Sequence, residues 1–142
     1  MSRFWHHAFR LQYRILALID PLVRGAWRHV GVGNVVELTV DRRNGAGSRS
    51  RLVGLLRVGR RRYLGHPNGD VGWTRDLEAA GGASYRWSYG SGTEFTVTRL
   101  ADGPEREAAI RATWQHPFPG NIIYRLGRSH VRAVGVFFRL ET

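Results

Sequence analysis

The sequence predicts an α+β domain built on an antiparallel sheet that curls into a barrel, with amphipathic helices at the N-terminal end. Short apolar runs rich in β-branched residues alternate with glycine turns, as in strands joined by hairpins. The N-terminal part instead repeats its apolar residues at spacings of three and four, which indicates helix. A chain of 142 residues suits one core. We therefore expect an N-terminal amphipathic helical segment at 1–30 and a barrel domain at 31–142.

The helical segment carries one stripe of apolar side chains at helical spacing. The stripe consists of Phe4, Ala8, Leu11, Ile15, Leu18, Leu22 and Ala26. Asp20 followed by Pro21 interrupts it. Because Asp caps helices and Pro suits a first helical turn, we predict two helices that meet there. The glycine-containing turn at 31–34 then ends the helical region.

This stripe has two predicted destinations, the barrel and a membrane surface. Its longest purely apolar run, Ile15–Ile19, is far shorter than the roughly 20 residues that span a bilayer. The N-terminus also lacks the pattern of a signal peptide. Five arginines lie on or around the stripe and attract anionic headgroups: Arg3, Arg10, Arg14, Arg24 and Arg28. We expect a cytoplasmic protein whose stripe packs on the barrel or rests on the inner face of the cell membrane.

The barrel domain opens with strand-like runs separated by turns. Val35–Val40 and Leu52–Val58 predict two strands, and Tyr63-Leu64 continues a hairpin after the polar turn at 59–62. Asn68-Gly69-Asp70 predicts a turn in which Asp70 caps a short helix at 71–80, which two glycines then stop.

The second half of the domain repeats this alternation. Ala83–Tyr89 and Glu94–Leu100 predict a second hairpin. Asp102–Glu105 resembles a capping box, which predicts a helix running toward Gln115. Val131–Leu140 predicts the closing strand.

Composition points to an anionic partner and excludes several kinds of site. All 22 basic residues are arginine, and the net charge is +11. Arginine stays charged and binds carboxylate or phosphate through two parallel hydrogen bonds. The absence of cysteine excludes disulfides, thiolate metal sites and cysteine nucleophiles. The six histidines have no metal-ligand spacing, so we expect no metal site, and no dinucleotide, P-loop or nucleophile-elbow motif is present.

Three segments carry a resemblance to a known family. A strand runs into the basic loop Asp41–Gly45, where glycine would let backbone N–H groups approach a phosphate. The helix beginning Trp73-Thr74-Arg75-Asp76-Leu77 follows a glycine-containing loop, and His116–Asn121 precedes Tyr124. In this order, residues 34–142 resemble the deazaflavin-dependent nitroreductase family, whose members use coenzyme F420.

The resemblance implies a split β-barrel of the FMN-binding type and a role for particular residues. By this resemblance, the phosphate and acidic tail of the deazaflavin lie on Arg42, Arg43, Asn44 and Gly45 with Arg49 or Arg51. His66, Asn68 and Trp73 would border the ring, and Tyr124 would face the substrate as a hydrogen-bond or proton donor. The implied reaction is hydride transfer to an apolar, flat acceptor such as a quinone or nitroaromatic, with F420 preferred to FMN.

Two other functions are weighed against this one. A non-catalytic protein on the same barrel, binding a lipid, a fatty acid or a cofactor, fits the departures from the family at Asp41, Asn44 and Gly54 and the amphipathic N-terminal helix. Nucleic-acid binding fits the charge, but the aromatic residues mostly fall on the apolar faces of predicted elements, which disfavours it. A homodimer is left open.

Overall fold

The computed structural model describes residues 2–31 and 33–142, and it confirms the α+β class. The helices are α1 (Ser2–Leu18), α2 (Asp20–Val30), α3 (Gly72–Ala80), α4 (Pro104–Arg111), the 3-10 helix η1 (Ala112–Gln115), α5 (Gly120–Leu126) and α6 (Arg128–Val134). The strands are β1 (Val35–Asp41), β2 (Ser48–Gly54), β3 (Leu56–Val58), β4 (Arg61–His66), β5 (Gly82–Arg86), β6 (Thr93–Arg99) and β7 (Val136–Glu141).

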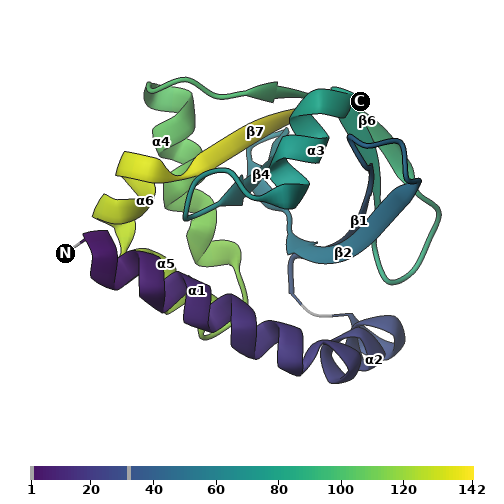
Figure 1. Ribbon diagram of the computed structural model, residues 1–142, viewed down its shortest axis with the longest axis horizontal. Helices are drawn as coiled ribbons and strands as arrows, with labels where there is room; N and C mark the ends of the chain where they lie inside the picture. The colour runs from purple at the N-terminus through teal and green to yellow at the C-terminus, as the bar shows by residue number, and fades with distance from the viewer. Residues whose placement is uncertain (1, 32) are drawn as a thin grey trace.

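The strands form one curled antiparallel sheet in the order β2-β1-β5-β6-β7-β4-β3 (Figure 1). Along β1 the side chains of Val36, Leu38 and Val40 are buried inside the curl, and the alternate residues face outward. Leu38 lies opposite Tyr85 of β5 on one side and Arg51 of β2 on the other. The predicted split β-barrel is therefore confirmed.

The neighbouring strands β4 and β7 separate two apolar cores. Leu64 and Phe138 belong to the core inside the barrel. Their neighbours Tyr63 and Phe137 belong to a second core, which the helices α1, α4, α5 and α6 cover. Both faces of these strands are therefore buried over their middle residues, which explains the consecutive apolar residues Tyr63-Leu64 in β4 and Val136-Phe137-Phe138 in β7.

Helix α1 attaches to the barrel through a stripe different from the predicted one. Trp5, Phe9 and Tyr13, spaced four residues apart, point toward the second core and the barrel, and Phe9 is fully buried. Leu11 and Leu18 of the predicted stripe are exposed to solvent. The expectation that this stripe packs on the barrel is wrong, because the larger aromatic side chains fill that contact. No helix in residues 2–31 or 33–142 has the length and apolar character needed to cross a membrane.

Two predicted strand boundaries need correction. Residues 131–134 are helical in α6, because the N–H of Val131 donates to the carbonyl of Gly127 and that of Gly135 to Val131. The closing strand starts at Val136. The run at 52–58 divides at Leu55, whose N–H donates to the carbonyl of Asn34 (2.9 Å). The turn predicted at 31–34 includes Val32, which lies outside the described residues.

The three predicted aspartate caps are also wrong by one residue. The caps are Ile19, Val71 and Gly103, and none of them makes a side-chain cap bond. Each neighbouring aspartate instead pairs with an arginine: Asp20 with Arg24 (2.7 Å), Asp70 with Arg99 (3.0 Å) and Asp102 with Arg106 (3.4 Å). In a chain this rich in arginine, a charged partner competes successfully for the carboxylate.

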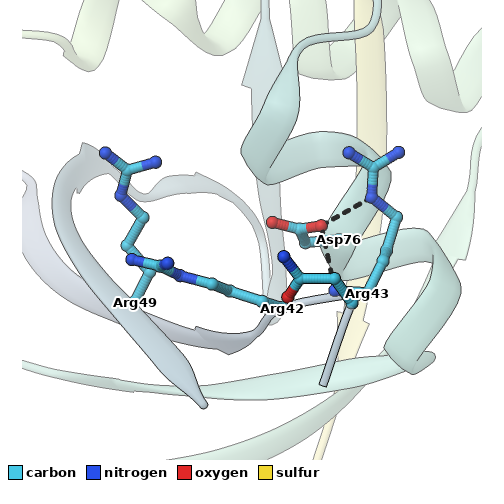
Figure 2. A pocket seen from close by; sticks show the side chains of 5 residues that line it. Arg42, Arg43, Arg49 and Asp76 are labelled. Carbon is cyan, nitrogen blue, oxygen red and sulfur yellow. Dashed lines mark hydrogen bonds and ion pairs between the residues drawn. The ribbon is translucent and has the colours of Figure 1, made fainter. Parts of the chain in front are cut away.

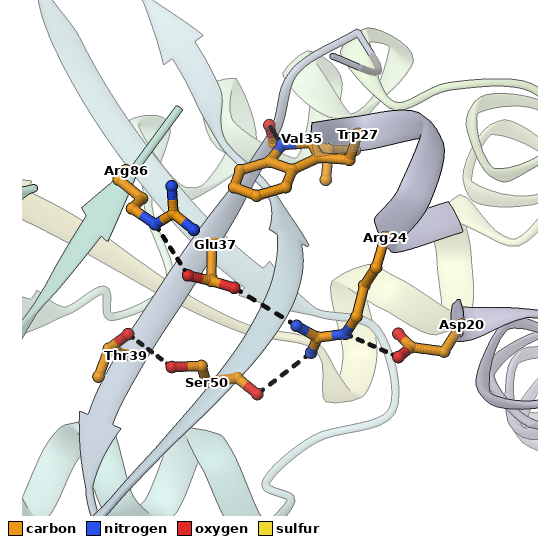
Figure 3. Close-up of polar contacts among 8 residues, drawn as sticks. All are labelled: Asp20, Arg24, Trp27, Val35, Glu37, Thr39, Ser50 and Arg86. Atoms are coloured by element: carbon orange, nitrogen blue, oxygen red, sulfur yellow. Dashed lines mark hydrogen bonds and ion pairs between the residues drawn. The ribbon is translucent and has the colours of Figure 1, made fainter. Parts of the chain in front are cut away.

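A polar seam fixes α2 to the outside of β1 and β2 (Figure 3). Arg24 joins Asp20 (2.7 Å) to Glu37 (3.4 Å) and also donates to the carbonyl of Ser50 (3.3 Å). Arg86 donates to the other oxygen of Glu37 (2.9 Å) and lies over the ring of Trp27. This seam therefore holds the bend between the helices at a fixed place on the sheet.

Candidate functional site

The β1–β2 loop and helix α3 enclose a basic hollow of about 520 Å³. We call it the basic hollow, and its lining consists of Arg42, Arg43, Asn44, Arg49 and Asp76. Figure 2 shows Arg43 turned toward Asp76, while the guanidinium groups of Arg42 and Arg49 extend to the other side. Four of the residues predicted to bind a cofactor thus meet at one place.

The loop reaches this shape through a tight turn at the end of the hairpin. Gly45 and Gly47 have φ values of 73° and 88°, a left-handed conformation that L side chains rarely adopt. The side-chain oxygen of Asn44 accepts from Ala46 N (2.9 Å), and Arg42 N donates to the carbonyl of Gly47 (2.8 Å). The N–H groups of Arg42 and Ala46 are therefore used within the loop. The loop lines the basic hollow through the side chains of Arg42, Arg43 and Asn44.

The charge of the basic hollow is unbalanced. Three guanidinium groups face one carboxylate, which leaves two uncompensated positive charges. Arg43 donates to Asp76 through Nε (2.6 Å) and through its backbone N (3.3 Å). The side-chain hydrogen bond from Arg43 is the main reason why the pKa of Asp76 lies below its ordinary value. The basic hollow therefore suits an anion.

A second hollow, of about 380 Å³, lies between α1 and the loop that follows β4. We call it the helix hollow. Its lining includes His6, Tyr13, His66, Asn68 and Asp70. The side chain of Asn68 joins its walls, since its amide nitrogen donates to the carbonyl of His6 (2.9 Å) and its Oδ1 accepts from Nε2 of His130 (2.8 Å). Asn68 thus fixes α1 and α6 to the loop.

Stacked aromatic rings continue inward from the helix hollow. Tyr13 stacks on His66, with ring centroids 5.0 Å apart, and Tyr124 stacks on His116 at 4.9 Å. The hydroxyl groups of Tyr13 and Tyr124 are hydrogen-bonded to each other, which joins the two stacks. Burial raises the pKa of both tyrosines and lowers the pKa of His66 and of His116 to about 4. All four rings are therefore uncharged near neutral pH.

Gly54 makes room for the inner stack. A Cβ placed on Gly54 would collide with Nδ1 of His116, closer than Cβ atoms approach their neighbours in proteins. Position 54, at the end of β2, must therefore stay without a side chain as long as His116 lies against Tyr124.

Strand β2 connects the two hollows. Arg49 lines the basic hollow, and the guanidinium of Arg51 lies 6.0 Å from the ring centroid of Trp73 on α3. Residues two apart on a strand point to the same side, roughly 7 Å from each other. Trp73 in turn lies 6.3 Å from His66, measured between ring centroids. A ligand along the inner face of β2 would thus meet arginine first and aromatic rings next.

The predicted residues fall into three places. The basic hollow is lined by Arg42, Arg43, Asn44 and Arg49, and Gly45 shapes their loop. The path from there toward the helix hollow is formed by Arg51, Trp73, His66 and Asn68. Tyr124 is buried behind Tyr13. Sequence reasoning missed Asp76 as a lining residue and missed Tyr13 and His116. The spacing of Trp5, Phe9 and Tyr13 was the signal that could have found Tyr13.

Comparison with known proteins shows the fold. No family profile and no curated protein sequence matches the chain. Among solved structures, an F420-H2-dependent reductase is 16% identical over 76% of this chain and 94% of its own, with a TM-score of 0.55. HutZ, the heme storage protein of Vibrio cholerae, is 12% identical over 87% and 89%, with a TM-score of 0.55. A chain described as a domain-swapped dimer is 13% identical over 93% and 99%, with a TM-score of 0.57.

Proposed function

We propose that this protein binds coenzyme F420 and transfers hydride from it to an apolar acceptor. The observation that carries the proposal is the inner face of β2, where Arg49 borders the basic hollow and Arg51 lies over Trp73. The cofactor combines an anionic phosphate and acidic tail with a flat aromatic ring. Guanidinium groups bind the first through charge-assisted hydrogen bonds, and aromatic side chains favour the second.

In this proposal the anionic end lies among Arg42, Arg43 and Arg49. Arg42 and Arg49 make no ion pair within the described part of the chain, so both are available to a ligand. Arg43 keeps its Nη groups for a ligand, because Asp76 engages its Nε. The similarity in fold to an F420-H2-dependent reductase supports this choice of cofactor over FMN, whose anionic part is a single phosphate.

The ring end would lie toward Trp73 and His66, with the acceptor in or beside the helix hollow. The cofactor supplies the hydride, so the protein needs to bind, orient and exclude water. Tyr13 borders this hollow and is hydrogen-bonded to Tyr124 behind it. A hydroxyl at this place can donate to an oxygen of the reduced acceptor, and its neighbour in the pair restores the hydrogen bond. We propose that Tyr124, predicted to act directly, acts through Tyr13.

Titration of the purified protein with F420 and with FMN tests the proposal. We expect F420 to bind more tightly and to lose affinity as salt is added, because its tail pairs with arginine. Reduced F420 should then be reoxidised by a quinone or a nitroaromatic only in the presence of the protein. FMN binding at least as tightly as F420 would overturn the choice of cofactor.

Two hydroxyl deletions test the acceptor side. Tyr13→Phe should retain F420 affinity and slow turnover about tenfold or more, the lower end of general acid–base effects. Tyr124→Phe should slow turnover less, because it removes only the partner of Tyr13. Phe118→Leu, at an exposed aromatic residue, is the matched control. Equal turnover in all three variants contradicts a role for the hydroxyl pair.

A non-catalytic carrier remains the second candidate. The helix hollow supports it, because α1 and stacked rings could enclose an apolar ligand, and one solved structure of similar fold is described as a heme storage protein. A protein that binds F420 or an apolar ligand but never reoxidises the reduced cofactor would favour this candidate.

We also propose a homodimer that forms along the outer edge of β2. At the opposite edge of the sheet, Gln115 already occupies the backbone of Arg57 with two hydrogen bonds (2.8 and 2.7 Å). Residues 48–51 of β2 are exposed, with a single side-chain hydrogen bond from Arg24 to the carbonyl of Ser50 (3.3 Å). An unpaired strand edge is a template for pairing with a second chain. A dimer mass by light scattering, with slowed hydrogen exchange in β2, is expected; a monomer at all concentrations contradicts the proposal.

A further inference from the structure

The outer face of the N-terminal helices is an exposed apolar surface. Its members and their exposed fractions are Phe4 (65%), Leu11 (58%), Ile15 (49%), Leu18 (83%) and Leu22 (77%). We call these five residues the outer stripe. Figure 1 shows α1 along the outside of the molecule, with α2 continuing beyond the barrel. A contiguous apolar surface of this kind on a soluble domain marks an interaction site.

The helix geometry separates this surface from the barrel contact. With about 100° of rotation per residue, the outer stripe is centred roughly 140° from Phe9, which faces the core. Trp5, Phe9 and Tyr13 already hold α1 on the barrel, so the fold does not depend on contacts of the outer stripe. Its exposure is therefore a property of the folded protein and not of a detached helix.

A row of basic side chains borders the outer stripe. Arg3, Arg10 and Arg14 lie on one side of α1, roughly 90° from the centre of the stripe. All three are exposed. The sequence has no acidic residue before Asp20, and Asp20 is paired with Arg24. The face that α1 presents to solvent is consequently apolar on one side and positively charged on the next.

We propose that this face docks on an anionic lipid bilayer, with α1 lying in the plane of the surface. An interfacial helix buries its apolar side chains among the acyl chains and keeps its arginines at the level of the headgroups. The side-by-side arrangement of the outer stripe and the arginine row satisfies both conditions at once. A second copy of the chain complements this face poorly, because pairing two such faces would bring their arginine rows together.

Vesicle co-sedimentation tests the proposal with the full-length protein. Vesicles of phosphatidylcholine alone are compared with vesicles that also contain phosphatidylglycerol, at low and high salt. We expect binding to the anionic vesicles, little binding to the neutral ones, and a marked loss at high salt. Equal binding to both vesicle types, or no binding to either, overturns the proposal.

Two sets of variants separate the apolar and the charged contributions. Leu11→Ser with Leu18→Ser should weaken vesicle binding tenfold or more, and so should Arg3→Gln with Arg10→Gln and Arg14→Gln. The matched charge control is Arg60→Gln with Arg75→Gln and Arg111→Gln, which removes three exposed arginines from other elements. This control should weaken binding less than threefold; an equal loss would show that net charge alone attracts the protein.

The same variants also test whether misfolding or self-association explains a loss of vesicle binding. Because Leu11 and Leu18 are exposed, their substitution should leave the circular dichroism spectrum and melting temperature unchanged. Light scattering without lipid reports self-association. If Leu11→Ser with Leu18→Ser converts an oligomer into a monomer, the outer stripe is a contact between copies and the lipid proposal is wrong.

Discussion

Two arginine clusters of this protein differ in their charge balance. In the seam between α2 and the sheet, Arg24 and Arg86 share the carboxylate of Glu37, and Arg24 also has Asp20 (Figure 3). The lining of the basic hollow has three arginines and one carboxylate, Asp76, which pairs with Arg43 (Figure 2). The seam is closed and balanced, whereas the basic hollow is open and retains positive charge.

This difference separates arginines whose charges are paired within the fold from arginines that we propose bind an anion. The Glu37 side chain is 13% exposed and meets two guanidinium groups, so each charge in the seam has a partner when water is excluded. In the basic hollow, Arg42 and Arg49 have no ion pair within the described residues, so water solvates their charges until an anion replaces it. Charge balance therefore says more about function than arginine content does.

The largest expected effect comes from breaking the seam. Glu37→Ala leaves Arg24 and Arg86 without their shared carboxylate and should lower the free energy of unfolding by about 2–4 kcal/mol. Urea denaturation measures this loss. Glu94→Ala, at an exposed glutamate on β6, is the control and should change stability by less than about 0.5 kcal/mol. Equal stability of the two variants would mean that the seam is not structural.

Removing the unpaired charges of the basic hollow should weaken ligand binding and leave stability unchanged. Arg42→Gln and Arg49→Gln should each weaken F420 or oligoglutamate binding about tenfold, since each removes a charge-assisted hydrogen bond worth ~1.5–3 kcal/mol. The unfolding curve should not move, because neither arginine is part of an ion pair. Arg60→Gln, on the exposed β3–β4 turn, serves as the control. Loss of stability without loss of affinity would place these arginines with those of the seam.

A smaller effect on ligand affinity should follow from removing the carboxylate of Asp76 from the basic hollow. Asp76→Asn frees Arg43 and removes a repulsive charge, so oligoglutamate affinity should rise roughly threefold, as expected for an exposed charge pair. Isothermal titration measures the change. Reduced affinity would instead show that Asp76 holds Arg43 in the orientation that the anion requires.

The smallest expected effect is that of pH on the basic hollow. The pKa of Asp76 is depressed by its bond to Arg43, so this pairing is present above the ordinary carboxylate range and is lost only when pH falls through the lowered value. Between pH 6 and 8 the arginines and Asp76 keep their charges. Oligoglutamate affinity should change less than threefold over this range. If oligoglutamate affinity fell more than threefold between pH 6 and pH 8, a histidine would be identified as part of the site.

The sequence predicted the parts of this site that depend on local order. Arg42, Arg43 and Asn44 share one hairpin loop, and the register of β1 with β2 brings Arg49 back beside it. The same reasoning predicted the curled sheet, because each strand run is bounded by turn residues. Whether these residues bind F420 stays a prediction.

Long-range packing decided what the sequence left open. Tyr13 and Tyr124 meet only because α1 crosses α5, and no local pattern relates them. Helix α1 carries two apolar stripes, one formed by Trp5, Phe9 and Tyr13 and the other by residues of the outer stripe. Periodicity alone does not say which of the two packs against the core. The aspartate caps failed for a similar reason, since distant or nearby arginines took the carboxylates.

Two of the tryptophans that lie beneath arginines, Trp27 and Trp73, lie at or beside the two clusters and can report on them by fluorescence. Trp27 lies under Arg86 in the seam with its indole N–H bonded to the carbonyl of Val35 (2.9 Å), and Trp73 lies under Arg51 on the helix that carries Asp76. The emission of Trp27 should therefore shift when the chain unfolds. That of Trp73 should be quenched by a flat chromophore arriving in the folded protein. In variants that keep only one of these two among the five tryptophans, ligand capture and loss of the fold can thus be followed separately without attaching a label.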